Sequence, residues 1–97
     1  MFRTRNFLVS WARGVEAHSR LGLVVSKKVG GSPQRNRVKR LVREWFRVTH
    51  HRLMDPWDLV VIARPGSSDL RLGDVQGQFE SLVAYLDRRS RKDSNPA

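Results

Sequence analysis

The 97-residue sequence predicts a small α+β domain built as a two-layer sandwich, with helices packed against a sheet. Three observations support this fold class. Two short apolar segments near the N-terminus have strand character, a long amphipathic helix follows them, and a β-branched run then leads into a second amphipathic helix. The predicted order is strand, strand, helix, strand, helix. A length of 97 residues gives room for one domain, and the 39% of hydrophobic residues is enough for a compact core.

The first strand is predicted from about Arg5 to Arg13, because the run Phe7-Leu-Val-Ser-Trp11 combines apolar and aromatic residues. A polar connection over residues 14–19 leads to a second strand at Leu21–Val25. This connection is short, so an antiparallel hairpin is the simplest way to pair the two strands.

The first helix is predicted from about Pro33 to Leu53. Gly30-Gly31 ends the preceding strand, and Ser32 is suited to cap the helix with Pro33 in its first turn, where a missing N–H group costs little. Asp55-Pro56 stops the helix, since the residue before a proline disfavours helical backbone angles.

The last strand and the last helix complete the fold. Trp57–Ala63 is a β-branched run of the kind found in buried strands, and a helix is predicted to begin near Asp74. That helix carries apolar residues at helical spacing: Val75, Phe79, Leu82, Val83 and Leu86. The polar residues after Ser90 favour a single domain over residues 1–90 and a flexible tail over 91–97.

The first helix is the most informative segment, because at about 100° per residue it presents two opposed faces. The apolar face is formed by Val38, Leu41, Val42, Trp45 and Phe46. The opposite face is formed by Asn36, Lys39, Arg40, Arg43 and Arg47, spaced so that one helix can contact several phosphates. Glu44 lies at the edge of this row and is expected to pair with a neighbouring cation, Lys39, Arg40 or Arg47. Trp45 and Phe46 are expected to pack in the core rather than to stack on bases.

The charge distribution points to a polyanionic partner. Residues 1–52 contain thirteen Lys or Arg against two acidic residues, whereas residues 53–97 contain six against seven. A positive field confined to one half of a small domain attracts phosphate backbones. The chain has no cysteine, which excludes disulfides and thiolate metal sites, and it has no apolar run long enough to span a membrane. No signal-peptide pattern is present, so a cytoplasmic location is expected.

The sequence gives less support to two other functional classes. An independent enzyme would need His50-His51 as a base, or a metal bound by aspartates such as Asp55, Asp58, Asp69 and Asp74. Adjacent histidines on a helix point about 100° apart, and the aspartates lie mostly at turns and at a helix start. A ribosomal-protein-like module or another basic nucleic-acid-binding module is the main alternative, since contacts to phosphates would look similar in each.

One motif narrows the choice. Lys27-Lys28-Val-Gly30 is followed after four residues by Arg35-Asn-Arg-x-Lys-Arg-x-x-Arg-Glu-x-Phe-Arg47, which resembles the signature of the bacterial ribonuclease P protein subunit. The resemblance covers about residues 5–90 and includes the run Asp58–Arg64. It implies a mainly antiparallel sheet with a left-handed βαβ crossover. It also implies a basic cofactor protein for the catalytic RNA that removes 5′ leaders from precursor tRNA.

The resemblance also assigns roles. Nine residues are predicted to bind RNA, eight of them matching the family motif and the last taken from the basic helix face: Lys27, Lys28, Arg35, Asn36, Arg37, Lys39, Arg40, Arg43 and Arg47. No residue of the chain is predicted to be catalytic or to bind a metal. The family implies an accessory subunit of an RNA-catalysed endoribonuclease, in which the partner RNA holds the Mg²⁺. The expected partners are ribonuclease P RNA and precursor tRNA, with neither a membrane nor an obligate protein partner.

Members of this family usually carry a helix with aromatic residues ahead of the strand that begins here at Phe7, and the present sequence starts too late to include it. That helix forms one wall of the cleft for the leader, and the sheet forms the other. Ser10 or Trp11 falls near the position where the family often places an aromatic residue on the sheet wall. Neighbouring residues of a strand point to opposite faces, so the strand register decides which of the two faces the cleft.

Overall fold

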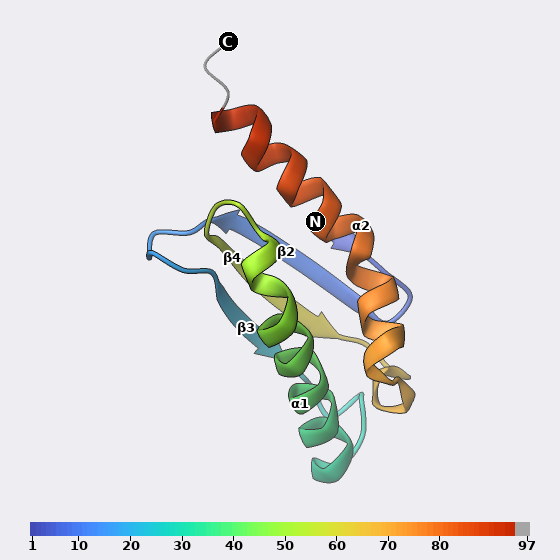
Figure 1. Cartoon of the computed structure of the whole chain (residues 1–97). Helices are drawn as coiled ribbons and strands as arrows, with labels where there is room; N and C mark the ends of the chain where they lie inside the picture. Colours follow the sequence, from blue (N-terminus) through green and yellow to red (C-terminus); the bar gives the residue numbers. More distant parts are fainter. Residues whose placement is uncertain (95–97) are drawn as a thin grey trace.

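A computed structural model describes residues 1–94 of the chain, and it has a four-stranded sheet with two helices on one of its faces (Figure 1). The strands are β1 (Phe2–Arg3), β2 (Phe7–Arg13), β3 (Arg20–Val24) and β4 (Trp57–Ala63). The helices are α1 (Ser32–Thr49) and α2 (Leu72–Ser94), with short 3₁₀ turns η1 (His50–Arg52) and η2 (Ser67–Asp69). The predicted two-layer α+β fold is therefore confirmed. No helix within these residues is long and apolar enough to cross a membrane.

The strand order β1-β2-β4-β3 shows that the predicted hairpin between the first two long strands is wrong. The last strand, β4, lies between β2 and β3, and it pairs antiparallel with β2 and parallel with β3. The connection between β2 and β3 must therefore cross two strand spacings, roughly 10 Å, which six residues easily span. It passes over the start of β4, where the amide of Gly14 donates to the carbonyl of Pro56 at 3.0 Å.

The parallel pair is joined by an uncommon connection. When Figure 1 is turned so that β3 and β4 point upward, with the helices toward the viewer, β4 lies to the left of β3. The β3–α1–β4 unit is therefore a left-handed crossover, against the strong general preference for right-handed ones. This agrees with the topology that the family resemblance implied.

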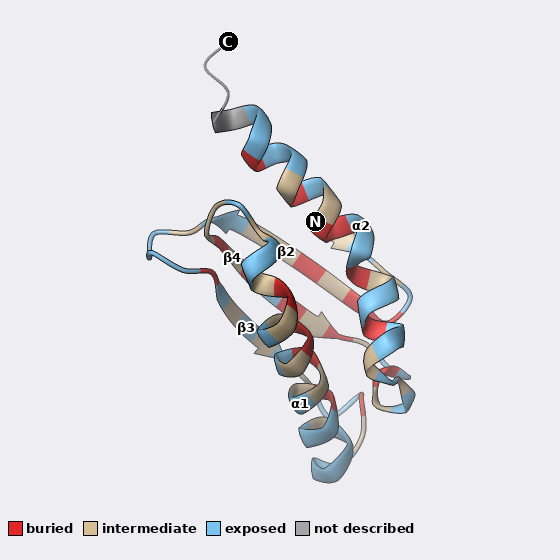
Figure 2. Ribbon diagram, in the orientation of Figure 1, coloured by how far each residue is buried: buried red, intermediate tan, exposed pale blue. Residues whose placement is uncertain are grey.

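The core lies between the sheet and the two helices, where Figure 2 shows the buried residues on the facing sides of both layers. Phe79 of α2 is at its centre and fully buried, with its ring centroid 4.9 Å from that of Phe7 and 4.5 Å from that of Trp45. These three rings join β2, α1 and α2. The packing confirms that Trp45 belongs to the core, as the helix periodicity predicted.

The helix ends differ in part from the predictions. Gly31, not Ser32, is the N-cap of α1, and Ser32 is its first residue. The α-helical part ends at Thr49, and residues 50–52 form a tighter 3₁₀ turn before Leu53 becomes extended. At the other end of the chain α2 continues to Ser94, and residues 95–97 lie outside the described residues.

The continuation of α2 has a physical reason, because Ser90 is fully buried and its hydroxyl accepts a hydrogen bond of 3.0 Å from the indole N–H of Trp57. A sequence reading that counts only apolar residues on the helical face overlooks this serine.

The opposite face of the sheet is covered by neither helix. The residues of β2, β3 and β4 that alternate with the core residues lie there, and the central triplet across the three strands is Ser10, Val60 and Gly22. Val60 is 42% exposed and Val24, nearby on β3, is 49% exposed. The sheet therefore offers a shallow, largely apolar surface that is independent of the basic helix.

Candidate nucleic-acid interface

The basic residues of α1 lie where the helix periodicity predicted, because Val38, Val42, Trp45 and Thr49 turn the other side of the helix into the core. Asn36, Arg40, Arg43 and Arg47 are exposed, and Lys39 is half-buried at the edge of the helix that faces β3. The structure thus brings five predicted residues onto one continuous surface.

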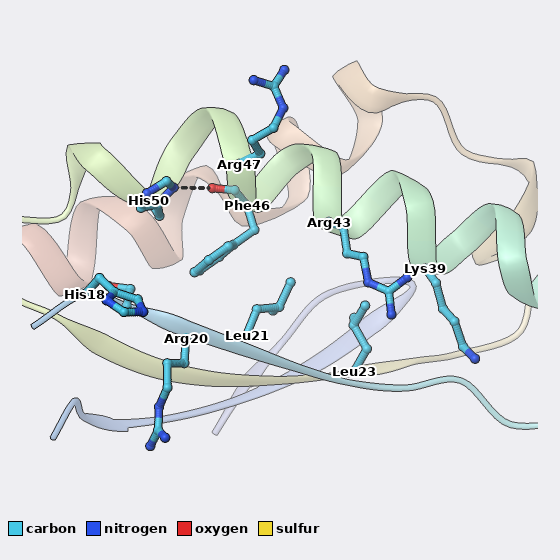
Figure 3. A pocket seen from close by; sticks show the side chains of 10 residues that line it. His18, Arg20, Leu21, Leu23, Lys39, Arg43, Phe46, Arg47 and His50 are labelled. Atoms are coloured by element: carbon cyan, nitrogen blue, oxygen red, sulfur yellow. Dashed lines mark hydrogen bonds between the residues drawn. The ribbon is translucent and has the colours of Figure 1, made fainter. Parts of the chain in front are cut away.

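Within this surface, Lys39 and Arg43 do not simply point into solvent. Figure 3 shows both side chains extending from α1 toward β3, with Arg43 near Leu23 and Lys39 beyond it. The ring of Phe46 projects into the same space, so a groove of about 600 Å³ forms between the helix and the edge strand. Its floor is apolar and its rim is cationic, which suits a ligand with flat apolar groups and phosphates.

Arg47 differs from its neighbours because Glu44 binds it. The guanidinium donates to both carboxylate oxygens of Glu44, at 2.6 and 3.0 Å, and these hydrogen bonds hold the pKa of Glu44 below its usual value. The sequence predicted a partner for Glu44 among three cations, and the structure identifies it. Arg47 consequently adds less net positive charge to the surface than Arg40 or Arg43 does.

Arg37 and Arg35 lie to the side of this surface. The Arg37 guanidinium donates to the carbonyl oxygens of Ser68 and Leu70, both at 2.9 Å, and thereby ties the 3₁₀ turn η2 to α1. Arg35 donates to the hydroxyl of Ser32 at 3.1 Å. Sequence reasoning gave Arg37 the same RNA-binding role as its neighbours and missed this internal contact, since nothing in the spacing shows that η2 packs against this flank.

We expect Arg37→Ala to lower the free energy of unfolding by about 1–3 kcal/mol, because two carbonyl groups lose a charged hydrogen-bond donor. Urea unfolding monitored by circular dichroism would measure the change. Arg40→Ala is the matched control, since Arg40 is exposed three residues further along the same helix, and it should change stability by less than about 0.5 kcal/mol. Equal stability of the two variants would show that the hydrogen bonds from Arg37 to η2 do not stabilise the fold.

Lys27 and Lys28 stand on the turn that enters α1, and both are exposed. The turn is fixed because the amide of Val29 donates to the carbonyl of Ser26 and the Val29 side chain is buried. Gly30 has a φ of +148°, and a Cβ atom there would lie 2.8 Å from the side chain of Gln34. The glycine therefore allows the two lysines to sit directly beside the first turn of the basic helix.

The register of β2 shows which face of the sheet Ser10 and Trp11 each occupy. Ser10 pairs with Val60 on the uncovered face of the sheet, whereas Trp11 lies on the helical face with its ring 5.6 Å from that of Tyr85. The two residues therefore cannot contribute to the same surface. The surface opposite the helices contains Ser10.

His50 and three of the aspartates considered as metal ligands have structural partners. A ring nitrogen of His50 lies 3.0 Å from the carbonyl oxygen of Phe46, and Asp55 and Asp58 form ion pairs with Arg13 and Arg20. Asp74 accepts a hydrogen bond from the amide of Arg71 at the start of α2. Among the residues that the structure describes, no group of three His, Cys, Asp or Glu side chains is placed to hold a metal ion.

Asp58 gives the fold a dependence on pH. Two hydrogen bonds from Arg20 lower the pKa of this carboxyl, so its contribution to stability is present above the ordinary pKa of an aspartate, about 4, and is lost as the pH falls through the lowered value. Asp58→Asn should melt below wild type at pH 7, and the difference should shrink as the pH falls below about 4. Melting curves of both proteins across this range test the prediction. Asp69→Asn, at an exposed turn position, should show a small difference at every pH.

Comparisons with known proteins agree with this geometry. The family model described as Ribonuclease P matches residues 1–87. The ribonuclease P protein component of Syntrophobacter fumaroxidans is 42% identical over 90 residues, which cover 92% of this chain and 76% of that protein. The component from Stutzerimonas stutzeri is 44% identical over 90 residues, covering 91% of this chain and 67% of that one, and the component from Pseudomonas aeruginosa is 46% identical over 81 residues, covering 82% and 59%.

Solved structures show the same fold. The RNase P protein from Thermotoga maritima superposes with a TM-score of 0.73 at 32% identity, over 90% of this chain and 80% of that one. The protein from Staphylococcus aureus has a TM-score of 0.69 at 33% identity, over 86% and 76% of the two chains. The fold, the basic α1 surface and these matches together show that the chain belongs to the ribonuclease P protein family.

Proposed function

We propose that this chain binds ribonuclease P RNA through the exposed side of α1 and helps the resulting ribonucleoprotein remove the 5′ leader of precursor tRNA. The observation that supports this most directly is the cationic surface of α1, where Arg40 and Arg43 project from a helix whose other side is fixed in the core. Lys27 and Lys28 extend the same positive region beyond the start of the helix.

The proposed role is positioning and charge neutralisation. Folded RNA brings phosphates close together, and a rigid row of guanidinium groups lowers their mutual repulsion while releasing condensed counterions. Asn36 adds an amide that can both donate and accept a hydrogen bond, so it is suited to a base edge or a ribose hydroxyl. The protein accordingly serves as the accessory subunit of an RNA-catalysed endonuclease.

The chemistry is assigned to the RNA. Mg²⁺ bound to the RNA would activate the water that cleaves the phosphodiester bond. Asp55 and Asp58 pair with arginines and Asp74 accepts a hydrogen bond at the start of α2. Among the described residues, no group of three His, Cys, Asp or Glu side chains is placed to hold Mg²⁺.

A second part of the proposal concerns the leader of the precursor tRNA. We assign the leader to the uncovered face of the sheet around Ser10, because this face is largely apolar and lies away from α1. Trp11 is left out of this assignment, since its side chain packs against α2.

Cleavage of a precursor tRNA at low Mg²⁺ tests the proposal. Three reactions are compared: the protein alone, a bacterial ribonuclease P RNA alone, and the mixture. We expect cleavage at the mature 5′ end only in the mixture, because the protein replaces part of the Mg²⁺ that the RNA needs to fold and to hold its substrate.

Two negative results have different meanings. Failure of the mixture with intact RNA binding would contradict the leader assignment and leave the α1 interface standing. Failure of both cleavage and RNA binding would overturn the α1 interface and favour another class of basic nucleic-acid-binding module.

A further inference from the structure

The C-terminal half of α2 carries a second cluster of positive charge that is separate from α1. Residues 85–92 contain four Lys or Arg and one acidic residue, Asp87. Asp87 accepts a hydrogen bond of 3.1 Å from Arg91, which leaves the positive charge concentrated on another side of the helix. There Tyr85, Arg88, Arg89 and Lys92 line a shallow groove of about 500 Å³.

These four residues form a row because their spacing is helical. Arg88, Arg89 and Lys92 lie three, four and seven positions after Tyr85, which places them on one side of the helix over two turns. The side that faces η1 is marked by Glu80, which forms an ion pair of 2.8 Å with Arg52. Tyr85 is five residues further on, about 140° around the helix. The row therefore points away from η1 and does not continue the basic surface of α1.

The aromatic ring in this row is held in place while staying accessible. Tyr85 is 37% exposed, its ring meets the edge of Trp11 at a centroid distance of 5.6 Å, and Arg89 donates to its hydroxyl at 3.2 Å. A fixed, exposed aromatic ring costs little conformational entropy when a ligand stacks on it. Arg88 and Lys92 lie about one and two turns further along the helix, where they can meet the phosphates of the strand that continues from a stacked base.

We propose that this row, the α2 patch (Tyr85, Arg88, Arg89 and Lys92), is a second RNA-binding site that takes an unpaired segment of the partner RNA. An unpaired strand is favoured over a duplex because a ring lying on a helix reaches only a base that has left its stack, whereas the bases of a duplex are stacked on each other. The charge of the row complements the phosphates of such a segment. This inference rests on the proposed function in one respect, the identity of the partner as ribonuclease P RNA.

The first test measures binding of a fluorescent 12-nucleotide oligouridylate and of a duplex of the same length by anisotropy, using the full chain. Tyr85→Leu should weaken binding of the single strand at least fivefold, because stacking on an aromatic side chain contributes about a factor of 5 to 150 per base, and should leave duplex binding unchanged. Arg88→Ala/Lys92→Ala should reduce the slope of log affinity against log salt for the single strand by about 1.4, since each neutralised phosphate contributes about 0.7.

The control is Arg5→Ala/Arg71→Ala, which removes the same charge from two exposed positions near the opposite end of α2. It should leave the salt slope and the single-strand affinity close to wild type. Melting curves establish that each variant is folded. The α2 patch is overturned if Tyr85→Leu binds the single strand as wild type does, or if duplex and single strand lose affinity equally.

A second test separates this inference from the proposed function. Wild type should protect an unpaired segment of ribonuclease P RNA from nuclease. Arg88→Ala/Lys92→Ala should leave this segment unprotected and still protect the other regions. Arg43→Ala should show the reverse pattern. Loss of the same protected region in both variants would overturn the α2 patch as a separate site, whereas absence of any protection by wild type would refute the proposed function itself.

Discussion

Arg40→Ala/Arg43→Ala should weaken binding to ribonuclease P RNA by about 100-fold or more and reduce the salt slope by nearly 2. Each guanidinium forms charge-assisted contacts to phosphate worth about 1.5–3 kcal/mol, which is roughly a factor of 10 to 100 in affinity. Each neutralised phosphate of a duplex contributes about 0.9 to the slope. Filter binding across a salt series measures both quantities, and cleavage of a precursor tRNA at low Mg²⁺ should fall in parallel.

The fold is not expected to respond to this double variant, because both side chains are exposed and the core face of α1 is unchanged. Arg5→Ala/Arg71→Ala removes the same charge away from α1 and should bind RNA within a few-fold of wild type. Similar losses in the two double variants would mean that net charge alone drives binding. Unfolding of Arg40→Ala/Arg43→Ala would show that the assignment of the two helix faces is wrong.

The α1 surface was predictable because its information is local. A helix repeats every 3.6 residues, so sequence position alone places Val38 and Val42 on the face opposite to Arg40 and Arg43. The position of Trp45 in the core follows from the same period. Such features need no knowledge of which strand or helix comes next to them.

The sheet order was not predictable in this way. Whether Leu21–Val25 pairs with the preceding strand or with a later one depends on contacts between distant segments, and the short connection over residues 14–19 favoured the wrong choice. The β-branched run Trp57–Ala63 is the most apolar of the strands and takes the central position, which separates the two earlier strands. The left-handed crossover was predicted from the family resemblance and not from the pattern of the strands.

The same limit applies to single side chains. The helical wheel puts Arg37 at the flank of the basic face, but only the folded chain shows that η2 lies there to receive it. Likewise, Ser10 and Trp11 were equivalent until the pairing of β2 with β4 fixed their directions. A residue's chemistry can be read from the sequence, whereas its neighbours come from tertiary packing.

Phe79→Ala should be the most destabilising single substitution in the core, lowering the free energy of unfolding by about 3–5 kcal/mol. Phe79 is fully buried, and its ring contacts both Phe7 and Trp45, so its removal leaves a cavity where α2, α1 and β2 meet. A domain of this size is stable by only about 5–15 kcal/mol, which means that the variant should melt many degrees lower or fail to fold at 37 °C.

Phe79→Leu provides the graded comparison, because it keeps most of the apolar volume and should lose clearly less stability than the alanine variant. Thermal melting and urea unfolding of wild type and the two variants measure the order of their stabilities. If Phe79→Ala were as stable as wild type, the two helices would not share one core, and the basic side of α1 would lose its rigid support. RNA affinity of Phe79→Leu, measured well below its melting temperature, should stay near that of wild type, because no RNA-facing residue of α1 has changed.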